Sequence, residues 1–318
     1  MNETINVTLA QLSPVLLNKK ATLEKMLDAV STAASDKSDL IVFGEALLPG
    51  YPFWTDALHG ATFNSKMHKE IHAKYMKEAI CLENDELLPL QETAKSEKIA
   101  MYVGIIERPL QRGGHSLYCS MVYIDKSGII QSVHRKLRPT YEERLSWSPG
   151  DGNGLAVHPL GAFTIGGLNC WENWMPLARA AMYAQGESLH VSIWPGSKRN
   201  TEDIIPFIAK EARSYSLGVS GLFRPSDIPD DFPFADELKQ AITSTIADGG
   251  SCLANPDGSW LIEPMKSEER IATVEINHAR VREERQNFDP SGHYSRPDVF
   301  KLSVNRERQS IIALGGSE

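Results

Sequence analysis

The chain has 318 residues, a formal net charge of −8 and 42% hydrophobic residues. This is the mix of a globular protein with a sizeable core, in one large α/β domain or two small ones. An acidic chain without a basic stripe is a poor candidate for binding nucleic acid or an anionic membrane. No uninterrupted apolar run approaches the ~18 residues of a membrane helix, and the first residues lack a secretory pattern. We therefore expect a cytoplasmic protein that binds neither nucleic acid nor membrane.

The first half of the chain predicts strands and helices in alternation. Residues Thr4–Leu12 alternate between apolar and polar side chains, which indicates a half-buried strand. Apolar residues between Leu23 and Val30 recur at helical spacing. The pattern further predicts helices over about 63–80 and Leu87–Glu97, and strands over Leu40–Phe43, Ala100–Ile106, Leu117–Ile124 and Ile129–His134.

The second half continues this alternation and adds hairpins. The segment Arg224–Asp236 is rich in proline and aspartate, and it predicts a surface loop or an interface insertion. Because no repeat or linker is visible, we expect one domain with a mixed sheet, or two sheets, covered by helices. The expected elements are strands over Ala162–Leu168, Leu189–Trp194 and Ile271–Ile276, two strands joined by a turn at 255–258, and helices over about 176–185 and Asp203–Leu217.

One of the four cysteines has an unusual setting. Cys170 follows a strand and precedes a helix within a few residues, whereas the other three lie in strand or helix patterns. A thiol near the positive end of a helix dipole is biased toward the nucleophilic thiolate. The alternative is a buried cysteine that simply ends a strand, and the local pattern alone leaves both interpretations open.

Two charged residues also follow predicted strands. Glu45 comes after an apolar strand, where desolvation would raise its pKa and suit it to act as a general base. Lys136 follows a hairpin strand, and a fixed ammonium there would stabilise negative charge on a substrate. Taken singly, Glu45 is better explained as an exposed glutamate that opens a loop, and Lys136 as one charge in a solvated basic run. Strand ends often converge on one site in layered α/β proteins, so the three residues together favour a catalytic site.

Two other patterns have some features of ligand sites. His68 and His72 have the i, i+4 spacing of zinc ligands, but the glutamate between them, Glu70, is not placed as in H-E-x-x-H. The glycine-rich run 150–154 lacks the spacing of a dinucleotide fingerprint. We therefore expect no metal site at the histidines and no nucleotide site at the glycines.

Five segments in one order resemble the nitrilase branch of the carbon–nitrogen hydrolase superfamily. The triplet Cys170-Trp171-Glu172 is typical of true nitrilases rather than of their amidase relatives. The resemblance extends from about residue 5 to 302, which is nearly the whole chain. The segments are Phe43–Pro52, Arg135–Arg144, Leu168–Leu177, His190–Gly196 and Gly292–Asp298.

This resemblance implies a fold and an assembly. The fold expected is a four-layer αββα sandwich that dimerises through its helices to αββααββα. Residues 1–318 would form a single carbon–nitrogen hydrolase domain, with a core over about 5–302 and a C-terminal tail beyond it. The protein is expected to be a homodimer or a larger spiral homo-oligomer.

The resemblance also implies roles for individual residues. Cys170 would be the nucleophile, Glu45 the general base and Lys136 the cationic stabiliser, while Glu143 would hold the lysine or assist proton transfer. The expected reaction converts a small nitrile and water to a carboxylic acid and ammonia through a cysteine thioimidate, with no metal or organic cofactor. The alternatives are an amidase or cyanide-converting relative, and a catalytically silent scaffold on the same fold.

The substrate pocket is expected to be lined mainly by aromatic side chains. Tyr51, Trp171 and Trp194 lie in or beside the matching segments, and Pro195 follows the last of them. Ordinary core packing is an equally good interpretation of Tyr51 and Trp194. The sequence leaves open whether the nitrile is aliphatic, aromatic or a dinitrile.

Overall fold

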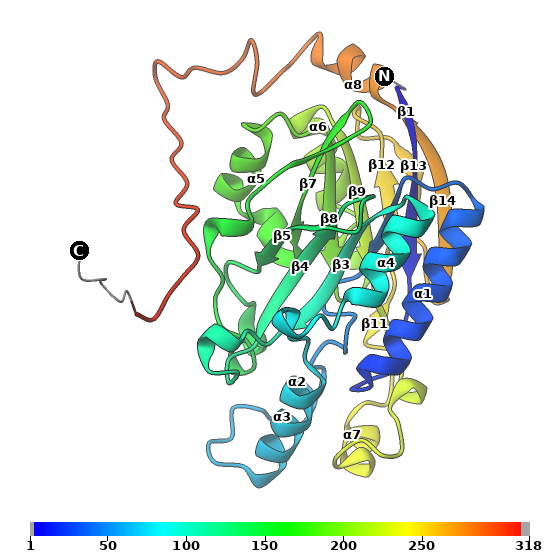
Figure 1. Cartoon of the computed structure of the whole chain (residues 1–318), viewed down its shortest axis with the longest axis vertical. Coiled ribbons are helices and arrows are strands. Elements are labelled where there is room, and N and C mark those ends of the chain that lie inside the picture. Colours follow the sequence, from blue (N-terminus) through cyan, green and yellow to red (C-terminus); the bar gives the residue numbers. More distant parts are fainter. Residues whose placement is uncertain (1–2, 313–318) are drawn as a thin grey trace.

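The computed structural model describes residues 3–312 and contains two six-stranded mixed sheets (Figure 1). The first sheet contains, in spatial order, β14 (Arg270–Asn277), β1 (Thr4–Gln11), β2 (Leu40–Phe43), β3 (Ala100–Glu107), β4 (Tyr118–Ile124) and β5 (Ile130–Arg135). The second contains β13 (Trp260–Ile262), β12 (Cys252–Ala254), β9 (Tyr215–Ser220), β8 (Leu189–Trp194), β7 (Phe163–Asn169) and β6 (His158–Leu160). A small ribbon pairs β10 (Leu222–Phe223) with β11 (Ala247–Asp248).

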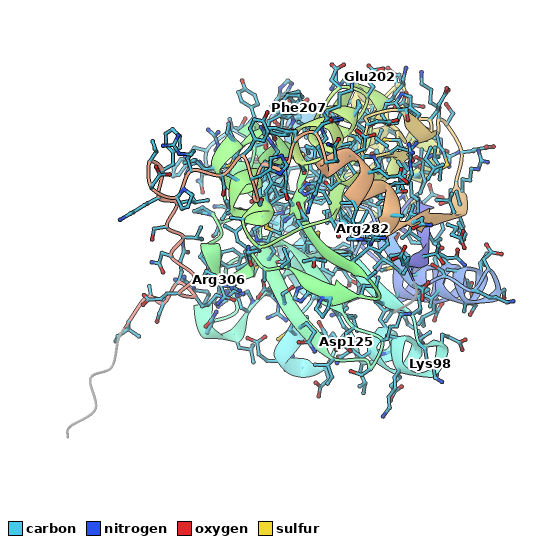
Figure 2. The ribbon with its side chains drawn as sticks, turned by 90° about the horizontal axis from the view of Figure 1, so that it is seen from above. Lys98, Asp125, Glu202, Phe207, Arg282 and Arg306 are labelled. Carbon is cyan, nitrogen blue, oxygen red and sulfur yellow. The ribbon has the colours of Figure 1, made fainter. Side chains whose placement is uncertain are left out.

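Helices cover the outer faces of both sheets. The first sheet carries α1 (Lys19–Ser35) and α4 (Leu88–Glu97), and the second carries α5 (Pro176–Tyr183) and α6 (Ile204–Ala212). Figure 2 shows Lys98, which follows α4, and Phe207 of α6 on opposite sides of the molecule. Beyond one end of the sheets lie α2 (Trp54–Ala57), α3 (Lys66–Glu78) and α7 (Ala235–Ala241), whereas α8 (His278–Arg285) follows β14 (Figure 1). The short 3-10 helices are η1 (Leu82–Asn84), η2 (Leu110–Arg112), η3 (Tyr141–Leu145), η4 (Gly152–Gly154), η5 (Cys170–Trp174), η6 (Lys198–Asn200) and η7 (Pro225–Asp227).

Apolar cores fill each space between the layers. Leu40 and Val42 of β2 point into the core between the two sheets, while Ile41 and Phe43 point into the core under α1 and α4. A strand buried on both faces is expected to be apolar at every position, and β2 is. The expected four-layer αββα sandwich is therefore confirmed.

One predicted helix was wrong in its last third. The helix expected over Asp203–Leu217 ends at Ala212, because Arg213 adopts a left-handed backbone with φ of +50° and its N–H bonds back to Ala209. The following residues form β9, which pairs with β8 and β12 inside the second sheet. Tyr215, Leu217 and Val219 of β9 face the core between the sheets. The spacing of apolar residues therefore changes from helical to alternating within a few residues.

The proline- and aspartate-rich segment 224–236 is only partly a surface loop. Ile228 and Phe232 are buried in an apolar cluster with Trp54 and Tyr75 of α2 and α3. The segment therefore packs apolar side chains against α2 and α3. Its polar composition did not indicate this packing.

The chain beyond α8 follows an extended path and then returns to the body (Figure 1). Arg308 binds Asp151 at 3.0 Å and donates to the carbonyl of Val133 on the edge strand β5 at 2.8 Å. Of the tail expected beyond 302, residues up to 312 are described and 313–318 lie outside the described residues. No helix over residues 3–312 is long and apolar enough to cross a membrane.

Gly104 of β3 lets the loop after β2 approach the sheet closely. A Cβ built on Gly104 would lie 2.0 Å from the carbonyl oxygen of Gly44 and 2.8 Å from the Cα of Glu45. Real Cβ atoms do not make such contacts, so any side chain here must push the loop away.

We predict that Gly104→Ala lowers the free energy of unfolding by ~1–3 kcal/mol, the usual cost of overpacking a core. The measurement is urea denaturation followed by fluorescence. The matched control is Gly292→Ala, whose new methyl meets the side chain of Asp289 and, among its nearest atoms, no backbone, so it should lower stability much less. Equal stability of the two variants would contradict the close approach of the loop.

Candidate active site

Three strand ends from two different sheets meet at one place. Glu45 follows β2 and Lys136 follows β5 in the first sheet, while Cys170 follows β7 in the second. The backbone N–H of Glu45 donates to the carbonyl of Trp194 at 3.1 Å, which ties the end of β2 to the end of β8 across the sheets. The side-chain ligand atoms of Glu45, Glu143 and Cys170 all lie within 4.8 Å of one another. The predicted convergence of strand ends is thus present in the structure.

The Lys136 ammonium lies between two carboxylates. Its Nζ is 3.0 Å from Glu45 Oε1 and 2.8 Å from Glu143 Oε2, and all three side chains are at most 2% exposed. Burial alone would lower the pKa of Lys136, but the neighbouring Cys170, Glu45 and Glu143 raise it well above its usual value. Lys136 is therefore a fixed buried cation, and the interpretation as one charge in a solvated run does not apply.

Glu143 is held by two further hydrogen bonds. It lies in η3, where its carboxylate accepts from the backbone N–H of Thr140 at 2.5 Å in a capping box. The hydroxyl of Tyr51 donates to Glu143 Oε1 at 2.9 Å. These contacts orient Glu143 toward Lys136 and fix the ammonium in turn.

Burial sets the protonation of the base and the thiol. It raises the pKa of Glu45 from 4.5 to about 8, against the opposing charge of Lys136. Burial also raises the pKa of the Cys170 thiol well above its usual range, and the charge of Glu45 adds to this while Lys136 opposes it. The expectation that a helix dipole favours the thiolate was wrong, because only the short η5 begins at Cys170 and desolvation dominates. A resting thiol therefore needs a base beside it.

The backbone at Cys170 is strained and is held in place by Asn173. Cys170 has a φ of +50°, a left-handed conformation that a side chain with a Cβ rarely adopts. Asn173 Nδ2 donates to the carbonyl of Cys170 at 2.8 Å, and its Oδ1 accepts from Ser192 at 2.7 Å and from His190 at 2.8 Å. This buried network maintains the sharp turn that presents the thiol.

Cys170 opens into a cleft of about 560 Å³. Tyr51, Trp171 and Pro195 line it as expected. Trp194 does not line it, because its side chain is fully buried in the core beneath α6. Other lining residues that the sequence did not single out include Phe53, Asp56, Thr140, Glu142, Arg199 and Asn200.

A local signal could have identified one of these missed positions. Thr140 and Glu143 fit the S/T-x-x-E pattern of a capping box, which places the threonine at the start of a turn beside the glutamate. Asp56 lies in α2, and Arg199 and Asn200 lie in η6. Their sequences carry no such pattern, and only the fold brings them to the cleft.

Two groups of residues were considered as metal ligands. Glu45, Glu143 and Cys170 are close enough to share an ion, but the Lys136 ammonium already lies between the two carboxylates and supplies the positive charge. His68 directs its Nε2 to the carbonyl of Leu58 at 2.8 Å rather than toward a shared ligand position. Neither arrangement favours a metal centre.

The chain matches the carbon-nitrogen hydrolase family over residues 6–286. It belongs to this family. A protein from an unknown prokaryotic organism, called nitrilase 2, is 34% identical over 99% of this chain and 98% of its own length. The aliphatic nitrilase of Rhodococcus rhodochrous is 30% identical over 97% of this chain and 81% of its own length. A bromoxynil-specific nitrilase of Klebsiella pneumoniae subsp. ozaenae is 32% identical, with 98% and 88% covered.

Solved structures share the fold of this carbon–nitrogen hydrolase. A carbon-nitrogen hydrolase from Helicobacter pylori G27 superposes with a TM-score of 0.66 at 19% identity, covering 93% of this chain and 96% of the other. The Nesterenkonia AN1 amidase from the nitrilase superfamily gives a TM-score of 0.60 at 16% identity, covering 89% and 94%. The four-layer architecture is therefore that of the family.

The raised pKa of Glu45 predicts how stability depends on pH. Between its usual value of 4.5 and about 8, Glu45 keeps its proton in the folded state and loses it in the unfolded chain. The folded state then binds more protons, so this group's contribution to stability is full below pH ~4.5 and is lost as the pH rises toward 8. The variant Glu45→Gln has no carboxyl group at this position, so it does not lose this stability. It should become more stable relative to the wild type as the pH rises.

The measurement is urea denaturation of both proteins at pH 5, 6.5 and 8. An identical pH dependence in the two proteins would show that Glu45 titrates normally in the fold. Glu268→Gln is the control, because Glu268 is exposed and should leave the pH profile of the wild type unchanged.

Proposed function

We propose that the protein hydrolyses a small organic nitrile to the carboxylic acid and ammonia. The observation that carries the proposal is the buried cluster of Glu45, Lys136 and Cys170 at the base of an open cleft. These three groups are a base, a cation and a nucleophile, which is what addition to a carbon–nitrogen triple bond requires. The names of the full-length relatives, at 30–34% identity, support nitriles as the substrate class.

The first proposed step is the attack of sulfur on the nitrile carbon. The ionised form of Glu45, which gains population as the pH approaches its raised pKa of about 8, accepts the proton of the Cys170 thiol as the carbon–sulfur bond forms. The raised pKa of the thiol leaves it protonated at rest. Negative charge develops on the nitrile nitrogen, and Lys136 stabilises it while the proton passes to nitrogen. The product of this step is a covalent thioimidate.

The remaining steps consume two water molecules. Glu45 removes a proton from the first water, which adds to the thioimidate carbon to give a tetrahedral intermediate. The nitrogen leaves as ammonia after protonation, and a thioester remains on Cys170. The second water attacks the thioester in the same way, which releases the carboxylic acid and restores the thiol. Glu143 holds Lys136 throughout, and we propose no metal or organic cofactor.

The cleft is proposed to bind the rest of the substrate. Tyr51, Trp171 and Pro195 supply apolar surface beside the thiol, and Tyr51 is fixed by its hydrogen bond to Glu143. Because Tyr51 contacts both the cleft and the cluster, it links the position of the substrate to the position of the ammonium.

We also propose a homodimer through the outer helices of the second sheet. Trp174, Leu177 and Phe207 are 40%, 72% and 44% exposed on neighbouring parts of η5, α5 and α6. A contiguous apolar surface of this kind usually marks a protein interface. A larger spiral built from such dimers, a single domain over 1–318 and a cytoplasmic location remain part of this proposal.

The test of the function is ammonia release from a panel of aliphatic, aromatic and dinitriles and from the matching amides. We expect wild-type protein to release ammonia from nitriles and Cys170→Ala to release none, because the variant lacks the nucleophile. Cys252→Ala is the matched control, since Cys252 is buried in a strand away from the cleft and should keep full activity. Ammonia from amides alone would instead assign an amidase, and no ammonia from any compound would favour a silent scaffold.

A second prediction concerns the cation. Lys136→Ala should lower kcat at least ~10²–10³-fold, the usual cost of losing one charge-stabilising donor. It should also lower the melting temperature, because two buried carboxylates lose their partner. Lys126→Ala removes a partly exposed ion pair with Asp39 and should change neither quantity appreciably. Wild-type kcat in Lys136→Ala would exclude the proposed role.

A further inference from the structure

Glu172 is a buried carboxylate that the proposed mechanism does not use. It lies two residues after Cys170 in η5, its side chain is 0% exposed, and it is not among the residues that line the cleft. Its Oε2 accepts from the backbone N–H of Asn169 at 2.8 Å, and its Oε1 accepts from the backbone N–H of Leu137. Both carboxylate oxygens of Glu172 are therefore occupied by hydrogen bonds from the protein backbone.

The two backbone amides belong to residues that adjoin the reacting groups. Leu137 follows Lys136, and Asn169 precedes Cys170. Lys136 extends the first sheet beyond β5, whereas Cys170 extends the second sheet beyond β7. One carboxylate thus bridges the two sheets at the point where the ammonium and the thiol meet.

A third contact keeps this carboxylate ionised. His134 Nε2 lies 3.0 Å from Glu172 Oε2, and an ionised carboxylate has no proton, so the imidazole N–H is the donor. Burial would raise the pKa of Glu172, but His134 and the two backbone N–H groups lower it below its usual value. An ionised carboxylate can accept both amides at once, which a neutral side chain with a single acceptor oxygen does less well.

We propose that Glu172 is a positioning residue that sets the separation of the Lys136 ammonium from the Cys170 thiol by fixing both adjoining backbone segments. This inference rests on the proposed nitrile hydrolysis for its kinetic consequence. Its structural content, the alignment of the thiol with the cation and the base, does not depend on the substrate. A displacement of about 1 Å between reacting groups typically costs ~10²-fold in rate.

The test compares Glu172→Gln with wild type in nitrile turnover. The amide group of glutamine cannot accept through its nitrogen, so one backbone segment loses its anchor. We expect kcat to fall ~10–100-fold while KM stays within about twofold, because the cleft lining is unchanged. The rate at which iodoacetamide alkylates Cys170, read by mass spectrometry of the peptide, should also fall.

A matched variant separates positioning from stability. Glu107→Gln alters another buried carboxylate, which binds the Arg135 guanidinium at 2.8 Å and the Ser120 hydroxyl at 2.7 Å and no backbone amide of the site. Both variants should lower the melting temperature, but Glu107→Gln should keep kcat and the alkylation rate near wild type. Equal loss of kcat in the two variants would overturn the proposal, as would wild-type kcat in Glu172→Gln.

A second substitution covers the possibility that Glu172→Gln does not fold. Glu172→Asp keeps the charge that His134 requires but is one methylene shorter, so it cannot reach both amides. It should fold and still lose kcat and alkylation rate, and unchanged values would overturn the proposal. If wild-type protein releases ammonia from no nitrile, the alkylation rates alone decide whether Glu172 aligns the thiol, so failure of the function and failure of the positioning role are distinguishable.

Discussion

The buried ion cluster of Lys136 with Glu45 and Glu143 is the constraint on which the rest of the site depends. Desolvating a charge costs several kcal/mol, and only well-placed opposite charges and hydrogen bonds offset this cost. Here one ammonium lies between two carboxylates, and burial raises the pKa of Glu45 against the charge of Lys136 while the second carboxylate, Glu143, raises it further. Burial also raises the pKa of the Cys170 thiol, and the charge of Glu45 adds to this, so the thiol is protonated at rest. By raising both pKa values, burial makes Glu45 a stronger base and keeps the Cys170 thiol protonated.

The packing of the two sheets sets the geometry of the cluster. Two sheets pack face to face, and the strand ends that carry Glu45, Lys136 and Cys170 cannot shift without disturbing the core between them. The strained backbone at Cys170 persists because the buried side chains of Glu172 and Asn173 hold the turn from two sides. Rigid layers with a strained, well-anchored turn at their edge are a common way to pre-organise reacting groups.

Apolar periodicity predicted helices that cover either one mixed sheet or two sheets, and only the family resemblance implied the four layers. The convergence of strand ends was predicted from the positions at which charged residues and a cysteine follow a strand. Sequence reasoning predicted correctly that desolvation raises the pKa of Glu45. It failed at β9, where a single left-handed residue, Arg213, ends a helix whose apolar pattern continues. It also overestimated the helix dipole at Cys170, since the length of η5 and the depth of burial are tertiary properties. Trp194 shows the same limit: a motif places a residue near a site but does not say which way its side chain points.

The residues that line the sides of the cleft come from a different part of the fold than the reacting groups at its base. The reacting groups are anchored in the sandwich, whereas Phe53, Arg199 and Ile246, which also line the cleft, come from three separate connections between strands. Loops tolerate substitution and insertion far better than packed strands do. Natural variation can therefore reshape the walls one loop at a time without risk to the chemistry, so a lineage with this architecture can change its preferred substrate in small, independent steps.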